Sequence, residues 1–98
     1  MTNEELVIEI KSGNNRLIDD LWAGVERFAC LQANKYYISK KGRLDALGCT
    51  EDDLIQVSFF AVMDAIAGFD TERETTFLTY LGYHLQRHFA NLACLRSS

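Results

Sequence analysis

Aromatic, basic and hydroxyl side chains gather at helical spacing near the end of the sequence. The set consists of Thr76, Thr79, Tyr80, Tyr83, His84 and Arg87. Residues three, four and seven apart share one side of a helix. Rings beside cations and hydroxyls can stack on unpaired bases and bond phosphates, so the pattern indicates a surface for single-stranded nucleic acid. The competing interpretation places both tyrosines at the edge of the core with polar tips, and spacing alone favours it.

A second set combines a carboxylate, an amide and an aromatic ring on one side of another expected helix. Asp53, Gln56 and Phe60 follow one another at spacings of three and four. Such a mixture is typical of a contact patch for a protein partner. A solvated face with one exposed Phe fits the spacing equally well, because single exposed apolar residues are common.

The sequence lacks the patterns of an enzyme. It has no Gly-rich phosphate loop and no H-E-x-x-H motif, and its paired carboxylates are adjacent in sequence and diverge on a helix. His84 and His88 have a metal-ligand spacing, but no acidic residue accompanies them on that helix. We therefore expect neither catalysis nor a metal or other cofactor. A metal-binding helical domain stays a minor alternative, which elemental analysis of the purified protein would test.

Length, charge and cysteine usage limit the class of protein. The 98 residues predict one domain, and the absence of Pro favours long helices. The net charge of −4 argues against non-specific nucleic-acid binding, yet no acidic residue lies between 77 and 98, and residues 35–43 are basic. Such separated charges suit two different partners.

Cys30, Cys49 and Cys94 are expected to be reduced core thiols of a cytoplasmic protein, since no secretion signal or membrane span is present.

Apolar periodicity predicts an all-α fold, a compact bundle of about four helices. The first helix begins after Thr2 and stops at Gly13. The second runs from Asn15 to about Tyr37 and ends in a polar loop at residues 40–42. The third begins at Thr50, where Asp53 completes a capping box, and ends at Gly68. The fourth follows a linker over residues 70–75. The stripes expected in the core contain Leu17, Leu21, Val25, Phe28 and Gln32; Ile55, Phe59, Val62, Ile66 and Phe69; and Phe77, Leu81, Leu85 and Leu92, with Tyr80 or Phe89 at the margin.

Three motifs in register give the second half of the chain a family resemblance. D-L-I-Q stands at residues 53–56, F-D at 69–70 and F-L-T-Y at 77–80. The stretch from 53 to 89 resembles conserved region two of the sigma-70 family of bacterial RNA polymerase sigma factors. There a D-L-I-Q helix ends in F-D and leads through an E-R turn into F-S-T-Y. The resemblance covers nearly the whole chain and implies the fold of that region for residues 1–98.

The resemblance implies two partners, RNA polymerase core and promoter DNA, and no membrane. The D-L-I-Q helix of such factors binds the clamp helices, a coiled coil on the largest catalytic polymerase subunit. The corresponding residues here are Asp53 and Gln56, with Leu54, Val57 and Phe60 as lesser candidates. The resemblance also allows an anti-sigma factor as a partner.

The following helix of such factors melts and captures the −10 promoter element on the non-template strand. Tyr80 stands where a tyrosine stacks on a flipped adenine, and Tyr83 and His84 stand where a tryptophan pair wedges the upstream fork. Arg87 stands where a residue reads the upstream edge of the element. Backbone contacts are implied for Arg73, Thr76 and Thr79.

Departures from the family pattern predict an alternative factor rather than a housekeeping one. Glu74 replaces a Gly, Thr76 replaces a basic residue, and Tyr83-His84 is smaller and more polar than two tryptophans. No helix-turn-helix domain for the −35 element is present, so we expect the chain to be the N-terminal part of a longer one. The alternative is a module derived from this fold that binds polymerase or another partner without reading DNA. Exposure of the Tyr80, Tyr83, His84 and Arg87 cluster favours DNA capture, and its burial favours the alternative.

Overall fold

The chain forms the predicted all-α bundle. The computed structural model describes residues 1–72 and 74–97, and these residues contain helices and no strand. The elements are α1 (Asn3–Lys11), the 3-10 turn η1 (Asn15–Leu17), α2 (Ile18–Ser39), α3 (Lys41–Ala46), α4 (Glu51–Gly68) and α5 (Phe77–Ser97).

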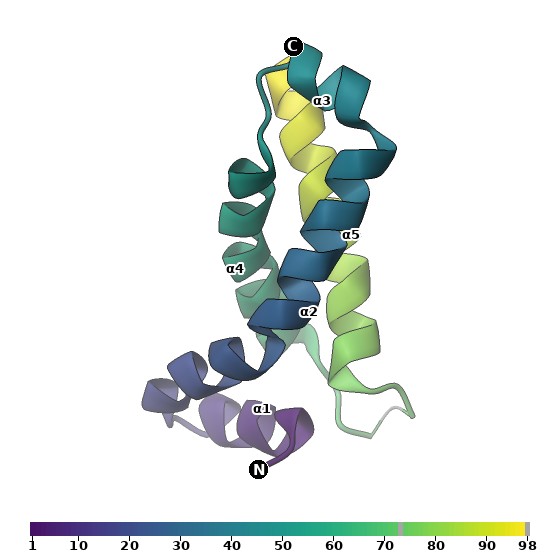
Figure 1. Ribbon diagram of the computed structural model, residues 1–98. Helices are drawn as coiled ribbons and strands as arrows, with labels where there is room; N and C mark the ends of the chain where they lie inside the picture. Colours follow the sequence, from purple (N-terminus) through teal and green to yellow (C-terminus); the bar gives the residue numbers. More distant parts are fainter. Residues whose placement is uncertain (73, 98) are drawn as a thin grey trace.

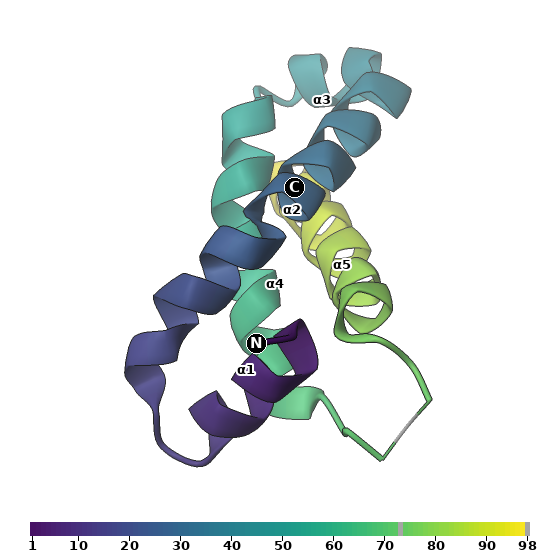
Figure 2. The ribbon, with the colours of Figure 1, turned by 60° about the horizontal axis from the view of Figure 1, so that its bottom comes forward.

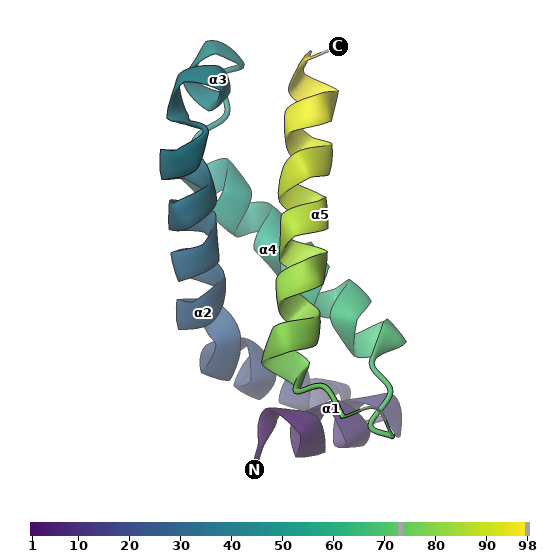
Figure 3. The same ribbon diagram turned by 90° about the vertical axis from the view of Figure 1, so that its right-hand side faces the viewer.

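Three long helices make the body of the bundle, and two short ones close its ends (Figure 1). α2 and α5 run in the same direction, while α4 runs the opposite way and packs on both of them (Figure 3). α1 lies across the end where α4 stops and α5 begins, and α3 lies at the other end. The largest fully buried side chains between the helices include Val7, Leu21, Val25, Leu44, Leu54, Val62, Phe77, Leu81, Leu85 and Phe89.

The predicted capping box at Thr50 is confirmed, and Thr2, the expected cap of the first helix, forms a capping box as well. Thr2 Oγ1 accepts from the Glu5 N–H at 3.1 Å, and Glu5 Oε1 accepts from the Thr2 N–H at 3.2 Å. Thr50 and Asp53 repeat the pattern at the start of α4, at 3.2 and 2.9 Å. Each box satisfies amides that have no partner within the helix, so the sequence locates these two helix starts.

The predicted core stripe of α4 is wrong in part. Phe59 is 37% exposed, and its ring packs edge-on against Trp22 with 5.5 Å between centroids. The buried side of α4 is turned towards Leu54, Ser58, Ala61, Val62, Ala65 and Ile66. Small residues on that side let α4 approach its neighbours closely, and a stripe chosen by residue size does not find them.

Other expected core positions also shift. In α2 the buried positions include Ala33 and Tyr36, whereas Phe28 and Gln32 are only half-buried. In α5 Phe89 is fully buried and Leu92 is half-buried, the reverse of the predicted order.

The segment after α2 is not a polar loop. Residues 41–46 form α3, which buries Leu44 against the end of the core. Among the cysteines, only Cys49 takes the predicted core position, since Cys30 is half-buried and Cys94 is exposed. No helix in the described part of the chain is long and apolar enough to span a membrane.

Candidate nucleic-acid interface and partner-contact surface

The outer face of α5 carries the aromatic and basic residues that point away from the core. The Tyr83 side chain is 72% exposed, and Arg87 and Thr79 are exposed on either side of it along the helix. Thr76 precedes the helix, and its hydroxyl accepts from the Thr79 N–H at 3.3 Å and lies 2.9 Å from the Thr79 hydroxyl. A ring, a guanidinium and two hydroxyls therefore follow one edge of α5. We call Thr76, Thr79, Tyr83 and Arg87 the α5 face.

Tyr80 and His84 lie behind this face and are half-buried. The Tyr80 ring lies 4.8 Å from the His84 ring and 5.7 Å from the Phe69 ring, centroid to centroid. The expected cluster is therefore split: Tyr83 and Arg87 are open to a ligand, and Tyr80 and His84 line the side of α5 that meets the end of α4. Arg73 lies outside the described residues.

Gly68 is the reason that Tyr80 can sit so close to α4. A Cβ atom on Gly68 would lie 2.5 Å from the Tyr80 hydroxyl oxygen, well inside van der Waals contact. The sequence predicts Gly68 as a helix stop, and α4 does end there. The left-handed backbone conformation that usually explains a terminal glycine is found at Gly13 and Gly48, not at Gly68. Close approach of a side chain is the physical reason for this glycine.

Partial burial also changes the ionisation of His84. Loss of solvent lowers the pKa of its imidazole, and the nearby charge of Asp64 opposes that shift, while Arg87 and His88 add to it. His88 Nε2 lies 2.7 Å from Asp64 Oδ2 and so links α5 to α4. The described residues, which include His84, His88 and Asp64, contain no group of three or more His, Cys, Asp or Glu side chains placed to hold a metal.

The outer face of α4 carries an apolar patch beside Gln56. Phe60 is 61% exposed, and Phe59 and Met63 are each 37% exposed. The rings of Phe59 and Phe60 lie 6.5 Å apart, and Trp22 from α2 continues the row. We call Gln56, Phe59, Phe60 and Met63 the α4 face. The sequence predicts Gln56 and Phe60 there. It misses Phe59, which its spacing assigns to the core, and it does not single out Met63.

Asp53 has structural partners of its own. Its carboxylate accepts from the Thr50 N–H at 2.9 Å and pairs with Arg96 Nη2 at 3.2 Å. The Thr50 amide is the main cause that lowers the pKa of Asp53, and Arg96 adds to it. Arg96 also donates to the Gly48 carbonyl at 2.9 Å, which ties the end of α5 to the start of α4. Asp53 is half-buried. It has a structural role at the start of α4 in addition to its position near the α4 face.

The remaining two candidates on α4 are less accessible. Leu54 is fully buried in the core, so the prediction that its side chain contacts a partner is wrong. The following candidate, Val57, is half-buried against the core.

A shallow groove between α2 and α5 borders the α5 face and has no counterpart in the sequence analysis. It has a volume of about 380 Å³. Its lining residues are Phe28, Gln32, Leu78, Thr79, Gly82, Tyr83 and Gln86. Gly82 lies in the groove, where an added Cβ would be in ordinary contact with the Phe28 ring at 3.9 Å.

No protein-family model, curated protein or solved structure matches this chain.

Proposed function

We propose that the chain is the region-two domain of an alternative sigma factor. It binds the clamp helices of RNA polymerase through α4, and it captures the unpaired non-template strand of the −10 element through α5. The observation that carries the proposal is the exposure of Tyr83. A ring that is 72% exposed, in one stripe with Thr79 and Arg87, contributes little to the core and is well placed to stack on a base.

The energetics of base capture are consistent with this surface. Extruding a base costs a few kcal/mol, and stacking on an aromatic side chain returns about 1–3 kcal/mol per base. Arg87 and the hydroxyls of Thr76 and Thr79 add contacts to phosphates. The net charge of −4 keeps the affinity of the isolated domain for DNA low, so polymerase must complete the DNA site.

The α4 face supports the polymerase half of the proposal. Aromatic residues are enriched in the buried centre of protein–protein interfaces, and here exposed rings lie beside an amide. Phe60 and Gln56 are the leading contacts. Asp53 acts partly by holding the start of α4, through Thr50 and Arg96, and so sets the angle at which this face is presented.

The DNA half is tested by binding labelled single-stranded DNA of random sequence and its duplex at low ionic strength. We expect the chain to prefer the single strand, and Tyr83→Ala to weaken that binding about tenfold, in line with one lost stacking contact. Tyr83→Trp retains a stacking ring and should bind at least as well as the wild type. Phe60→Ala removes an exposed ring from α4 and is the matched control, which should bind like the wild type.

Equal loss of DNA binding in the Tyr83→Ala and Phe60→Ala proteins would contradict the assignment of α5. A chain that binds clamp helices but shows no preference for single strands would instead be the module that contacts polymerase without reading DNA.

A further inference from the structure

Two charged side chains of α1 contact the helix ends on both sides of the segment that joins α4 to α5. Glu4 Oε2 accepts from the backbone N–H of Phe77, the first residue of α5, at 2.9 Å. Lys11 Nζ donates to the carbonyl of Phe69, directly after α4, at 2.9 Å, and to the carbonyl of Ala67 at 3.4 Å. These bonds occupy groups that have no partner inside their own helices.

Both charges match the helix dipoles that they meet. A carboxylate is favoured at the N-terminus of α5, and an ammonium group is favoured at the C-terminus of α4. Glu4 and Lys11 are seven residues apart in α1 and therefore lie on one side of it, about 10 Å from one another along its axis. Val7 stands between them and is fully buried, so the same side of α1 is held against the bundle.

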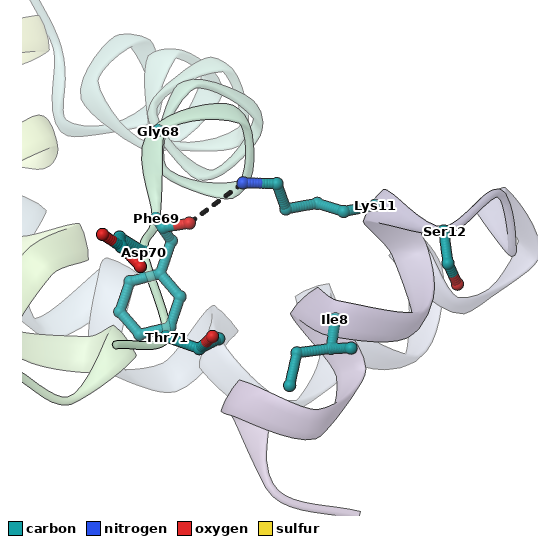
Figure 4. Close-up of a pocket in the computed structure, with 7 residues that line it drawn as sticks. All are labelled: Ile8, Lys11, Ser12, Gly68, Phe69, Asp70 and Thr71. Carbon is teal, nitrogen blue, oxygen red and sulfur yellow. Dashed lines mark hydrogen bonds between the residues drawn. The ribbon is translucent and has the colours of Figure 1, made fainter. Parts of the chain in front are cut away.

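The contact made by Lys11 crosses an open crevice. Ile8, Lys11 and Ser12 line one wall, and residues 68–71 line the other, around a volume of about 510 Å³. Figure 4 shows the Lys11 side chain extended across this space to the Phe69 carbonyl, while Ile8 and Ser12 stay on their own side. The polar contact, rather than apolar packing, joins α1 to the end of α4 at this point. Figure 2, in which this end of the bundle comes forward, shows α1 in front of the end of α4 and beside the start of α5.

We propose that Glu4 and Lys11 are positioning residues that fix the spacing between the end of α4 and the start of α5. They thereby fix the position of the α5 face for single-stranded DNA. The consequence for DNA rests on the proposed function, whereas the bracing itself does not. Neither residue needs to touch the nucleic acid.

The proposal can be tested with the random-sequence single-stranded DNA, because bracing and simple electrostatics predict opposite effects of removing Glu4. Glu4→Ala removes a negative charge, so electrostatics alone predicts tighter DNA binding. The loss of bracing predicts the opposite, and we expect about fivefold weaker binding, comparable to the loss of one helix cap. Lys11→Met should weaken binding as well. Glu4→Gln, which keeps an acceptor oxygen, and Lys11→Arg, which keeps the donors and the charge, should restore most of the affinity.

A second readout is independent of DNA. Hydrogen exchange at the Phe77 amide should accelerate about fivefold or more in Glu4→Ala and stay close to the wild-type rate in Glu4→Gln. Affinity for a clamp-helix fragment should not change. The matched control is Glu26→Ala, which removes an exposed carboxylate from the middle of α2 and should leave the Phe77 exchange rate unchanged.

The possible failures can be told apart. Unchanged exchange at Phe77 in Glu4→Ala would overturn the bracing. Faster exchange together with unchanged or tighter DNA binding would overturn the positioning role. If the wild-type chain binds no single-stranded DNA, the DNA half of the proposed function fails along with the positioning role, and the exchange rate alone decides the bracing.

Discussion

Tyr80 and Gly68 form a contact whose energetics depend on a single oxygen atom. Ala normally stabilises a helix relative to Gly by up to about 1 kcal/mol. At Gly68 the added Cβ would lie 2.5 Å from the Tyr80 hydroxyl oxygen but 3.6 Å from the ring carbon that carries it. Removal of the hydroxyl therefore turns a clash into an ordinary contact.

We predict that the effect of Gly68→Ala on stability changes sign between the wild-type and the Tyr80→Phe proteins. Gly68→Ala should destabilise the wild-type chain by about 1 kcal/mol, because Tyr80 must shift away from Phe69 and His84. In the Tyr80→Phe background the same substitution should be neutral or stabilising. Chemical denaturation of the four proteins of this cycle measures the coupling. Equal effects of Gly68→Ala in both backgrounds would show that the close approach does not exist.

Sequence reasoning can identify Gly68 and Tyr80 as residues of interest, but it cannot explain their relation. A glycine at the end of an apolar period predicts a helix stop, and α4 stops there. The contact that requires the glycine joins two helices, so no local pattern encodes it.

At the scale of the element, the start of α4 combines a cap with an ion pair. Asp53→Ala removes the acceptor for the Thr50 N–H and the partner of Arg96, and we expect a loss of about 1 kcal/mol of stability. Gln56→Ala, on the exposed side of the same helix, should change stability by less than about 0.5 kcal/mol. Thermal unfolding of both variants measures the difference. Equal stability of the two proteins would mean that the cap and the ion pair contribute nothing.

This difference matters for binding experiments on α4. A weaker affinity of the Asp53→Ala protein mixes a lost contact with a displaced helix start. Gln56→Ala reports contact alone. Asp53→Asn keeps an acceptor for the Thr50 amide and removes the charge that pairs with Arg96, so it separates the two roles of this side chain.

The elements differ in how well local sequence predicts them. The starts of α1 and α4 follow from capping boxes, in which all the partners lie within three residues. α3 is missed because its six residues have one buried side chain, Leu44, which is too short a period to recognise. Local sequence predicts only part of the α4 face. Whether Phe59 lies in the core or at the surface depends on how closely α4 approaches its neighbours.

For the molecule as a whole, His84 makes stability depend on pH. Burial holds the folded-state pKa of His84 below its unfolded value of about 6.5, so the unfolded chain binds more protons between the two values. The stability contribution is full above the unfolded pKa and is lost as the pH drops from the unfolded pKa to the folded one. Asp64, Arg87 and His88 face the same region. His84→Gln should therefore reduce the fall in Tm between about pH 7.5 and pH 5.5.

His88 and Asp64 are present in both proteins of that comparison, so the difference isolates His84. An equal fall in Tm for the wild type and His84→Gln would contradict its burial. A further loss of stability is expected below about pH 4, because capping amides lower the pKa of Glu5 and of Asp53. That loss should be unaffected by His84→Gln.

The all-α architecture follows from periodicity, caps and the absence of Pro, but the relation of α1 to the rest does not. The 2.9 Å contacts of Glu4 with Phe77 and of Lys11 with Phe69 join residues 73 and 58 positions apart in the chain. Glu4 reads locally as a first-turn acid of α1, and Lys11 as a last-turn base. The fold gives both a second role at the ends of α4 and α5, which only the three-dimensional arrangement reveals.

The proposed binding of α4 to the clamp helices of RNA polymerase can be measured as the affinity of the chain for a purified clamp-helix fragment. The wild-type chain should bind, and Gln56→Ala and Phe60→Ala should each weaken binding about tenfold or more, as substitutions at a contact centre do. Leu31→Ala removes an apolar side chain that is 52% exposed on α2 and should bind like the wild type. Absence of binding by the folded wild-type chain would contradict the proposal that α4 contacts polymerase. An equal loss of affinity in Gln56→Ala, Phe60→Ala and Leu31→Ala would contradict it as well.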